Sequence, residues 1–380
     1  MPITLTRISV SAYRVPIETA VATSFGVMTN RPAVFVRLED QDGTFGFGEI
    51  FANWPAAGAE HRARLVVEDF ADLLVGQSFD GRSDLFDTLT RRTHIRAVQC
   101  GEWGPFRQVI AGLDTAYIDL LARRADMSVA RFLEPTATDA VPCYASGIAI
   151  GQAETQIPKS REAGFSRFKV KVGFDMARDV ERLKSVYADL ATGDLLHADA
   201  NQAWDVTQAE TFLQATRDVS LGWLEEPLPA DASPEHWAAL ADLSDTPLAA
   251  GENIAGTADF ATAIRSGNFG VVQPDVAKWG GVTGNWQVAL AIRAAGLRYC
   301  PHFLGGGIGL IASAHLLAAA GGDGILEVDV NPNPLRNAFD LWGDGAGTGN
   351  MPIPDVPGLG ITELPPNLAP YRTYTHTLTI

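Results

Sequence analysis

Three carboxylate residues recur at almost equal intervals in the middle of the chain. They are Asp199, Glu225 and Glu252, which lie 26 and 27 residues apart, and each ends a short apolar run and precedes polar or turn-forming residues. An interval of this length accommodates one strand, one loop and one helix. We therefore expect a repeated βα unit with a carboxylate at the end of each strand.

The same interval continues on both sides of the trio. Lys171 lies 28 residues before the first carboxylate, and Asp275, His302 and Glu327 follow the last one at successive gaps of 23, 27 and 25 residues. Seven successive units thus place ionisable side chains at the ends of strands. Parallel strands joined by helices form a βα barrel, in which the loops that follow the strands converge at one end. Residues far apart in the sequence are expected to meet there.

The segment Phe168–Val172 alternates apolar and basic residues. A period of two directs its apolar side chains toward the surrounding helices and directs Lys169 and Lys171 into the barrel. Buried ammonium groups are costly unless anions face them, and the three carboxylates would supply those anions. Because clustered carboxylates also repel one another, we expect a divalent cation to be bound by all three. A ligand set of oxygen atoms favours Mg²⁺ over zinc or copper.

The composition narrows the class of protein. The chain has 29 basic and 45 acidic residues and a net charge of −16, with no basic stripe, which argues against binding to nucleic acid or to an anionic membrane. No cationic segment followed by an apolar one marks a signal peptide. The cysteines, at positions 100, 143 and 300, show no paired spacing. We therefore expect a soluble protein in a reducing cytoplasm.

The 380 residues are expected to divide into three parts. Residues 1–135 combine alternating strands with segments of helical apolar spacing, which predicts an α+β domain. Residues 136–330 would form the barrel. Residues 331–380 are rich in Gly and Pro before an alternating segment that we expect to return to the first domain as a strand. Two loops of the first domain, at residues 19–32 and 51–58, would cover the barrel.

At these residues the chain resembles the enolase superfamily, and within it the mandelate racemase subgroup. The resemblance implies an α/β fold, a modified TIM (β/α)7β barrel with an N-terminal α+β capping domain. It spans the whole chain and rests on seven elements in matching order and spacing, namely Lys169-x-Lys171, Asp199, Glu225 in Glu-Glu-Pro, Glu252 in Gly-Glu-Asn, Asp275 in Pro-Asp-Val-Ala-Lys-Trp-Gly-Gly, His302 and Glu327.

The resemblance implies Mg²⁺-assisted abstraction of the proton next to a substrate carboxylate, which gives an enediolate. Such a proton is weakly acidic, so preplaced positive charge and hydrogen-bond donors must meet the new negative charge. Lys171 would be the base on one face of the substrate, its neutral form favoured by Lys169 and the metal. His302, oriented by Asp275, would be the acid or base on the other face. A protonated Glu327 would donate a hydrogen bond to the substrate carboxylate.

Further residues are expected to contact the substrate. Lys169 and Glu327 would do so from the barrel, and Asn201 would touch either the ligand or a metal-bound water. Phe25 and Trp54 would contribute from the two covering loops, where specificity should lie.

Four neighbouring features have more than one interpretation. Glu226 and Lys278 are each out of phase with a proposed functional residue and are interpreted as structural, whereas Asp329 shares a face with Glu327 and could take its role. The glycine-rich Gly305–Gly309 could form a phosphate-binding loop. We favour a tight loop that lets the following helix approach the site, because no basic residue follows.

Two acid/base groups on opposite faces permit two reactions on a small carboxylate substrate. We expect dehydration of a sugar acid to a 2-keto-3-deoxy acid, with racemisation of a 2-hydroxy acid as the alternative because the covering loops are rich in apolar residues. Muconate-lactonising and dipeptide-epimerising relatives have a lysine where Asp275 stands, which disfavours those activities. A catalytically inactive binding protein is disfavoured because no expected ligand or base is missing. We also expect a homo-oligomer.

Overall fold

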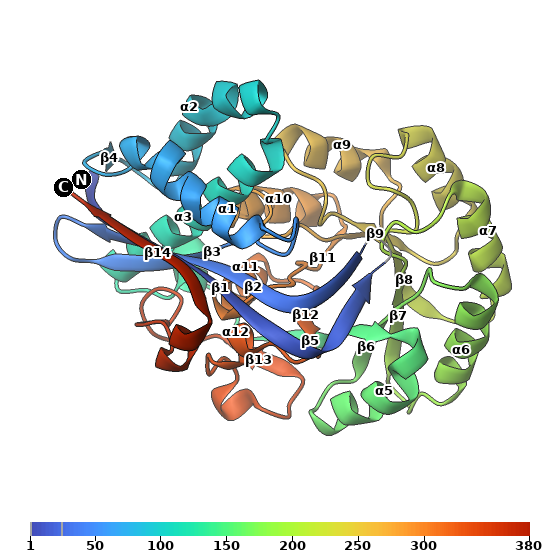
Figure 1. Cartoon of the computed structure of the whole chain (residues 1–380). Coiled ribbons are helices and arrows are strands. Elements are labelled where there is room, and N and C mark those ends of the chain that lie inside the picture. The colour runs from blue at the N-terminus through green and yellow to red at the C-terminus, as the bar shows by residue number, and fades with distance from the viewer. Residues whose placement is uncertain (1, 24–25) are drawn as a thin grey trace.

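The 26- and 27-residue intervals of the sequence each span one strand and the helix that follows it. The computed structural model describes residues 2–23 and 26–380 and contains eight parallel strands that form the barrel in Figure 1. The predicted (β/α)7β barrel is therefore confirmed. In hydrogen-bonded order its strands are β11 (Arg298–Tyr299), β10 (Val271–Val272), β9 (Leu248–Ala250), β8 (Leu221–Glu225), β7 (Leu195–Asp199), β6 (Arg167–Lys171), β5 (Ala140–Ala149) and β12 (Leu326–Asp329).

Seven helices connect these strands and cover the outside of the barrel (Figure 1). Their N-termini carry local signals: Asp205 caps α7 through a capping box, and Ser233 caps α8. The helices are α5 (Ala153–Glu162), α6 (Met176–Ala188), α7 (Val206–Ala215), α8 (Pro234–Leu243), α9 (Thr257–Ser266), α10 (Gly281–Ala294) and α11 (Gly307–Ala320). A short α12 (Pro334–Asn337) and β13 (Asn350–Pro352), which pairs with β5, follow the barrel.

The barrel interior is a packed core and not a channel. The rings of His197 and Trp223 stack with their centroids 3.6 Å apart, and Tyr144 meets Trp223 edge to face at 5.2 Å. Burial lowers the pKa of His197 well below its ordinary value, so this imidazole is neutral. Packed aromatic rings therefore fill the barrel interior next to the polar residues at the strand ends.

The remaining elements form an antiparallel sheet with helices on one side. Its strands follow the order β14 (Arg372–Thr379), β1 (Ile3–Thr23), β2 (Gly26–Asp40) and β3 (Phe45–Ile50), with β4 (Ser78–Phe79) beside β1. A Cβ atom on Gly48 would lie 1.9 Å from the carbonyl oxygen of Gly112, so the glycines of β3 allow a helix to pack directly on the strand. The helices are α1 (Gly58–Leu65), which continues through a π turn and a 3-10 turn to Leu73, α2 (Asp84–Cys100), α3 (Trp103–Arg124) and α4 (Val129–Leu133).

The prediction of a loop over residues 19–32 is wrong. Strands β1 and β2 extend through this segment as a long hairpin, in which Val21 pairs with Met28 after a register shift that follows Pro16. Backbone pairing on both sides of this shift is the physical reason, because it satisfies peptide groups that a loop would leave to water. The hairpin reaches across the barrel end in Figure 1. Phe25 lies outside the described residues.

Two buried carboxylates join the capping domain to the barrel. Glu49, at the end of β3, accepts hydrogen bonds from the backbone amides of Gly306 at 2.5 Å and Gly309 at 2.8 Å, at the start of α11. Asp114, on α3, accepts one from the amide of Thr283 at 2.8 Å, at the start of α10. An anion at a helix N-terminus is stabilised by free amide groups and the helix dipole. Because these amides already donate to Glu49, they are not free to bind a phosphate group. The phosphate-binding alternative for Gly305–Gly309 is therefore disfavoured.

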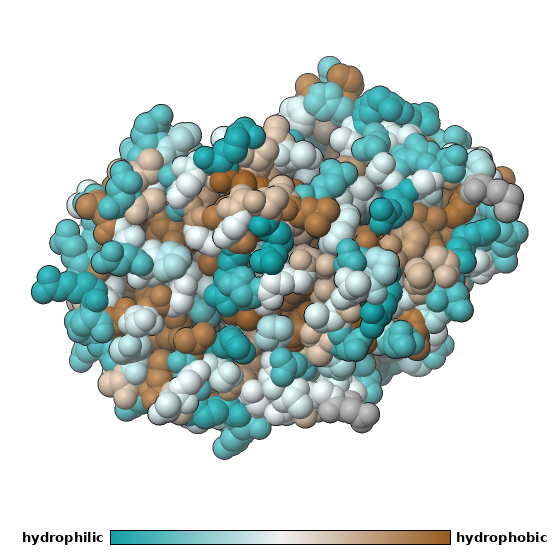
Figure 2. Space-filling view, turned by 180° about the vertical axis from the view of Figure 1, so that it is seen from behind, coloured by the Kyte–Doolittle hydropathy of each residue, from teal (hydrophilic) through white to brown (hydrophobic). Residues whose placement is uncertain are grey.

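The outer surface shown in Figure 2 is mostly hydrophilic, with smaller apolar areas between the polar side chains. Within residues 2–23 and 26–380, no helix combines the length and the apolar character needed to cross a lipid bilayer.

Replacing Glu49 with Gln is expected to flatten the pH dependence of folding stability. Burial raises the pKa of Glu49 from 4.5 to about 7. Because the native state then holds a proton that the unfolded chain releases, the stability from this group is complete below pH 4.5 and is lost as the pH rises through about 7. Chemical unfolding at a series of pH values should therefore show a smaller decline for Glu49→Gln than for wild type. Equal declines in the two proteins would contradict this linkage, and Glu363→Gln, at an exposed position, is the control.

Candidate active site

A cavity of about 190 Å³ lies where the barrel strand ends meet the capping domain. It brings together residues at or just after the ends of seven of the eight barrel strands, all except β8, as expected for the carboxyl ends of parallel strands. Its barrel side includes Lys171, Asn201, Glu252, Lys278, His302 and Glu327. Its capping side includes Val21, Met28, Phe51, Asn53 and Trp54.

The three predicted metal ligands lie on neighbouring strands at this end. Asp199 and Glu225 are the last residues of β7 and β8 and pair directly across the sheet, and Glu252 follows β9 by two residues. Their exposed fractions are 0%, 2% and 8%. Three buried carboxylates on adjacent strands form an oxygen-only donor set of the type that Mg²⁺ prefers. The chemistry of these residues therefore fits that ion.

In this structure each of these carboxylates contacts a basic group. The ammonium of Lys171 lies 2.6 Å from Asp199 and that of Lys169 lies 2.5 Å from Glu225. Glu252 lies 2.7 Å from the Nε2 atom of the His302 imidazole. Across the part of the chain that the structure describes, no three His, Cys, Asp or Glu side chains converge closely enough to share one ion. The carboxylates are thus adjacent but turned toward cations of the protein.

Lys169 is the centre of this charge network. Its side chain is 0% exposed, and its ammonium lies 2.5 Å from Glu225, 2.7 Å from Glu327 and 3.4 Å from Asp199. Burial alone would lower the pKa of Lys169, but these carboxylates raise it well above its ordinary value. The ammonium is therefore charged, and it neutralises part of the negative charge at the strand ends.

Lys171 has a different environment from the one expected. Burial and the neighbouring Lys169 lower the pKa of Lys171, yet Asp199 together with Glu225 and Glu252 outweighs them and the pKa is raised. The expectation of a neutral amine included the charge of a bound metal ion, so it stays a prediction for the Mg²⁺-loaded site. Proximity to Lys169 does act in the predicted direction, but a carboxylate at 2.6 Å is the stronger influence.

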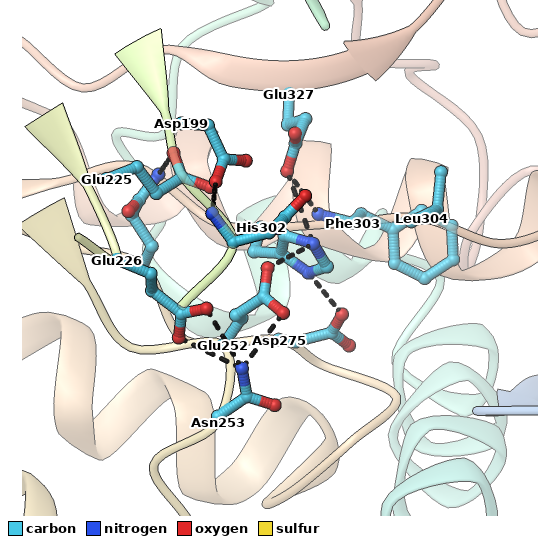
Figure 3. A network of polar contacts seen from close by, with 12 residues as sticks. Asp199, Glu225, Glu226, Glu252, Asn253, Asp275, His302, Phe303, Leu304 and Glu327 are labelled. Atoms are coloured by element: carbon cyan, nitrogen blue, oxygen red, sulfur yellow. Dashed lines mark hydrogen bonds and ion pairs between the residues drawn. The ribbon is translucent and has the colours of Figure 1, made fainter. Parts of the chain in front are cut away.

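His302 and Asp275 form a hydrogen-bonded pair. The Nδ1 atom of His302 lies 2.6 Å from a carboxylate oxygen of Asp275, and the two residues form a parallel β-bridge. Figure 3 shows the imidazole between Asp275 on one side and Glu252 on the other, with Glu327 nearby. Burial alone would lower the pKa of His302, but Glu252, Glu327 and the Asp275 hydrogen bond raise it well above its ordinary value. Asp275 thus orients the ring, and its Nε2 faces the cavity carboxylates.

Glu327 is held in an ionised form. Its two oxygens accept hydrogen bonds from the Ser146 hydroxyl at 2.5 Å and the Phe303 amide at 3.1 Å. Burial would raise the pKa of Glu327, but Lys169 and His302 lower it below its ordinary value. Two basic groups lie within 3.7 Å of this carboxylate. A protonated Glu327 beside a substrate carboxylate stays a prediction.

The remaining predicted contacts are placed as follows. Asn201 is buried, lines the cavity and donates its backbone amide to Asp199 at 2.8 Å. Trp54 lines the cavity from the capping domain, whereas Phe25 lies outside the described residues. Glu226 contacts Asn253 at 2.9 Å and is absent from the cavity lining formed by the described residues.

Lys278 was wrongly interpreted as structural only. Its ammonium lies 2.9 Å from Glu252 and its side chain lines the cavity. The rule of alternating faces does not apply at this position because residues 276–280 form turns after the strand. The sequence feature that could have identified Lys278 as a cavity residue is its position three residues after Asp275, in the turn that follows the strand. Asn331 and Gln152 also line the cavity and were not predicted to contact the substrate, and Asp329, the alternative to Glu327, lines it as well.

Comparison with known families and proteins agrees with this geometry. Residues 3–133 match the N-terminal domain model of mandelate racemase and muconate lactonizing enzyme, and residues 152–364 match the enolase C-terminal domain-like model. A solved mandelate racemase/muconate lactonizing enzyme from Bordetella bronchiseptica RB50 is 45% identical with a TM-score of 0.92, covering 98% of this chain and 100% of that one.

Curated relatives act by related chemistry. L-talarate/galactarate dehydratase from Salmonella typhimurium is 30% identical over 88% of this chain and 81% of its own length. L-talarate dehydratase from Polaromonas sp. JS666, solved with Mg and L-glucarate, is 28% identical with a TM-score of 0.82 over 100% of this chain and 99% of its own. Other relatives at 25–29% identity are named as dehydratases, cycloisomerases and an epimerase. These are Mg²⁺-dependent lyases and isomerases.

Replacing Glu225 with Gln is expected to weaken Mg²⁺ binding roughly 100-fold or more, since loss of even an outer partner of a metal site costs about 10- to 100-fold. The neighbouring Glu226→Gln variant is the matched control, because Glu226 contacts Asn253 and not the cavity. Isothermal titration with Mg²⁺ measures both affinities. Equal losses in the two variants would contradict the assignment of Glu225 as a ligand.

Proposed function

Because this chain belongs to the enolase superfamily, in its mandelate racemase and muconate lactonizing enzyme branch, we propose that it removes the proton next to the carboxylate of a hydroxy acid. The reaction that we favour is dehydration of a sugar acid to a 2-keto-3-deoxy acid. The observation that carries the proposal is that one cavity is lined by Lys171, Glu252 and His302. Behind this lining, Asp199 contacts Lys171, Asp275 contacts His302, and Glu225 pairs with Asp199 across the sheet.

Each basic group has a separate role in this proposal. Lys171 accepts the proton next to the substrate carboxylate, after losing the proton that Asp199 now stabilises. His302, oriented by Asp275, donates a proton to the departing hydroxyl group, as its raised pKa favours. Lys169 balances the charge of the surrounding carboxylates. Asp199, Glu225 and Glu252 would hold Mg²⁺, and the bound ion would supply positive charge at the substrate carboxylate.

Dehydration is favoured by the polar part of the cavity wall. Asn53, Ser146, Gln152 and Asn331 present amide and hydroxyl groups, which can hydrogen-bond the hydroxyl groups of a sugar acid. Relatives named as arabinonate, galactonate and galactarate dehydratases support the same reaction.

Racemisation or epimerisation of a 2-hydroxy acid is the second candidate. It is favoured by the apolar side chains of the capping domain, where Val21, Met28, Phe51 and Trp54 line the cavity. The same pair of acid/base groups would then return the proton to the opposite face and leave the hydroxyl in place.

Incubation of the wild-type protein with Mg²⁺ and a panel of sugar acids is expected to form a 2-keto acid from at least one of them. Lys171→Met and His302→Asn should each lower that rate by about 10²- to 10⁴-fold, because each removes a general acid or base. The exposed Lys159→Met is the matched control and should keep the wild-type rate. Inverted configuration without any keto acid would favour the racemase, and wild-type rates in both active-site variants would contradict the assigned roles.

A further inference from the structure

The two carboxylate oxygens of Glu225 have different kinds of partner. Its Oε2 accepts hydrogen bonds from the side chains of Trp223 at 3.0 Å and Gln273 at 2.7 Å. Both donors are uncharged and buried, with exposed fractions of 0% and 1%. Its Oε1 instead faces the ammonium of Lys169 at 2.5 Å. Oε2 is therefore fixed by neutral donors of the fold, and Oε1 is the oxygen that already accepts a positive charge.

The two oxygens of Glu252 are divided in the same way. Its Oε1 accepts hydrogen bonds from the side chains of Asn253 at 3.1 Å and Lys278 at 2.9 Å, and these donors also bond to each other at 3.2 Å. Figure 3 shows the Asn253 amide between Glu252 and Glu226. The Oε2 atom of Glu252 faces the imidazole of His302 at 2.7 Å. A connected pair of donors thus holds Oε1, and Oε2 has the imidazole as its partner.

Asp199 completes the pattern. Its Oδ1 accepts a hydrogen bond from the backbone amide of Asn201 at 2.8 Å. Its Oδ2 faces the ammonium of Lys171 at 2.6 Å and that of Lys169 at 3.4 Å. In each proposed ligand, one oxygen is therefore held by a donor that the fold keeps in place. The other oxygen faces a basic group to which the proposed function gives a role.

The position of Lys278 is itself determined by its surroundings. Its backbone amide donates to Oδ1 of Asp275 at 3.1 Å, and its ammonium lies 5.1 Å from the centre of the Phe51 ring in the capping domain. The Oδ2 atom of Asp275 contacts His302 at 2.6 Å. Asp275 therefore places one basic group at each oxygen of Glu252.

We propose that these donors limit each carboxylate to one metal-binding oxygen, and that this limit makes the site select Mg²⁺ over Ca²⁺. The inference rests on the ligand set of the proposed function and assigns its metal selectivity to Trp223, Gln273, Asn253 and Lys278. Mg²⁺ demands near-ideal octahedral geometry, whereas Ca²⁺ takes roughly 6–8 oxygens and often binds both oxygens of a carboxylate. Three single oxygens occupy half of an octahedron and leave the other half to substrate and water, but they are few for Ca²⁺.

Replacing Gln273 with Met tests this limit without changing the charge of the site. The variant removes the shorter hydrogen bond to Oε2 of Glu225, so this carboxylate can offer both oxygens, which benefits Ca²⁺ and not Mg²⁺. Isothermal titration with each ion should show tighter binding of Mg²⁺ by the wild-type protein. In Gln273→Met, the Kd for Ca²⁺ divided by the Kd for Mg²⁺ should fall about tenfold. Gln108→Met is the matched control, because Gln108 accepts hydrogen bonds from Arg62 in the capping domain, and it should keep the wild-type ratio.

Replacing Lys278 with Met tests the limit at Glu252. The lost positive charge changes the affinity for both divalent ions alike, so it cancels in the ratio of the two Kd values. The release of Oε1 does not cancel and should lower this ratio about tenfold. Lys184→Met, which removes an ammonium paired with Asp218 at 2.9 Å, is the control. A merely structural defect would reduce the amount of folded protein for both ions and leave the ratio unchanged.

The inference and the proposed function fail in distinguishable ways. Tighter binding of Ca²⁺ by the wild-type protein would overturn the inference, and so would equal ratios in wild type, Gln273→Met and Lys278→Met. Either result, together with turnover of a sugar acid, would leave the proposed function in place. If the wild-type protein bound neither ion, the assignment of the three ligands would be wrong, and both proposals would be overturned.

Discussion

The buried ammonium of Lys169 is the constraint on which the active-site end of this barrel depends. Three carboxylates from three other strands lie within 3.4 Å of it. Removing either the cation or the carboxylates would leave uncompensated charge in a site without solvent, which is strongly destabilising. The same arrangement keeps an acidic cluster together at the strand ends, so one set of interactions both stabilises the fold and prepares the residues for a divalent cation.

The capping domain reaches this cluster through contacts on the other side of the barrel. Glu49 and Asp114 bind the N-termini of α11 and α10, and these helices follow the strand ends that carry His302 and Asp275. The buried Arg31–Asp329 ion pair joins β2 to β12. These contacts fix the capping domain over the cavity, so that its hairpin and the segment containing Trp54 form the upper wall. The substrate is therefore selected by both domains together.

The sequence was sufficient to predict the repeated βα units. The 26- and 27-residue intervals revealed the barrel, and the alternation in Phe168–Val172 placed both lysines at its active end. The alternation rule failed for Lys278, which follows a strand and lies in a turn. The Glu49 contact joins residues 257 positions apart, so no local pattern could indicate it. The ion pairs of Lys171 and Glu327 also escaped prediction, because they depend on distances between side chains of different strands.

The prediction of a loop over residues 19–32 failed for a related reason. Residues 19–32 contain glycine, proline and polar residues that are typical of a loop, but pairing between β1 and β2 overrides that local preference. The position of the hairpin matters for function, since Val21 and Met28 line the cavity.

The central claim, that this cavity removes the proton next to a carboxylate, is tested most directly by proton NMR in D₂O. The wild-type protein with Mg²⁺ should eliminate the signal of that proton from a sugar acid that it turns over, whether the product is a 2-keto acid or an epimer. Lys171→Met together with His302→Asn should abolish the loss. Turnover with the proton retained at that carbon would contradict the account.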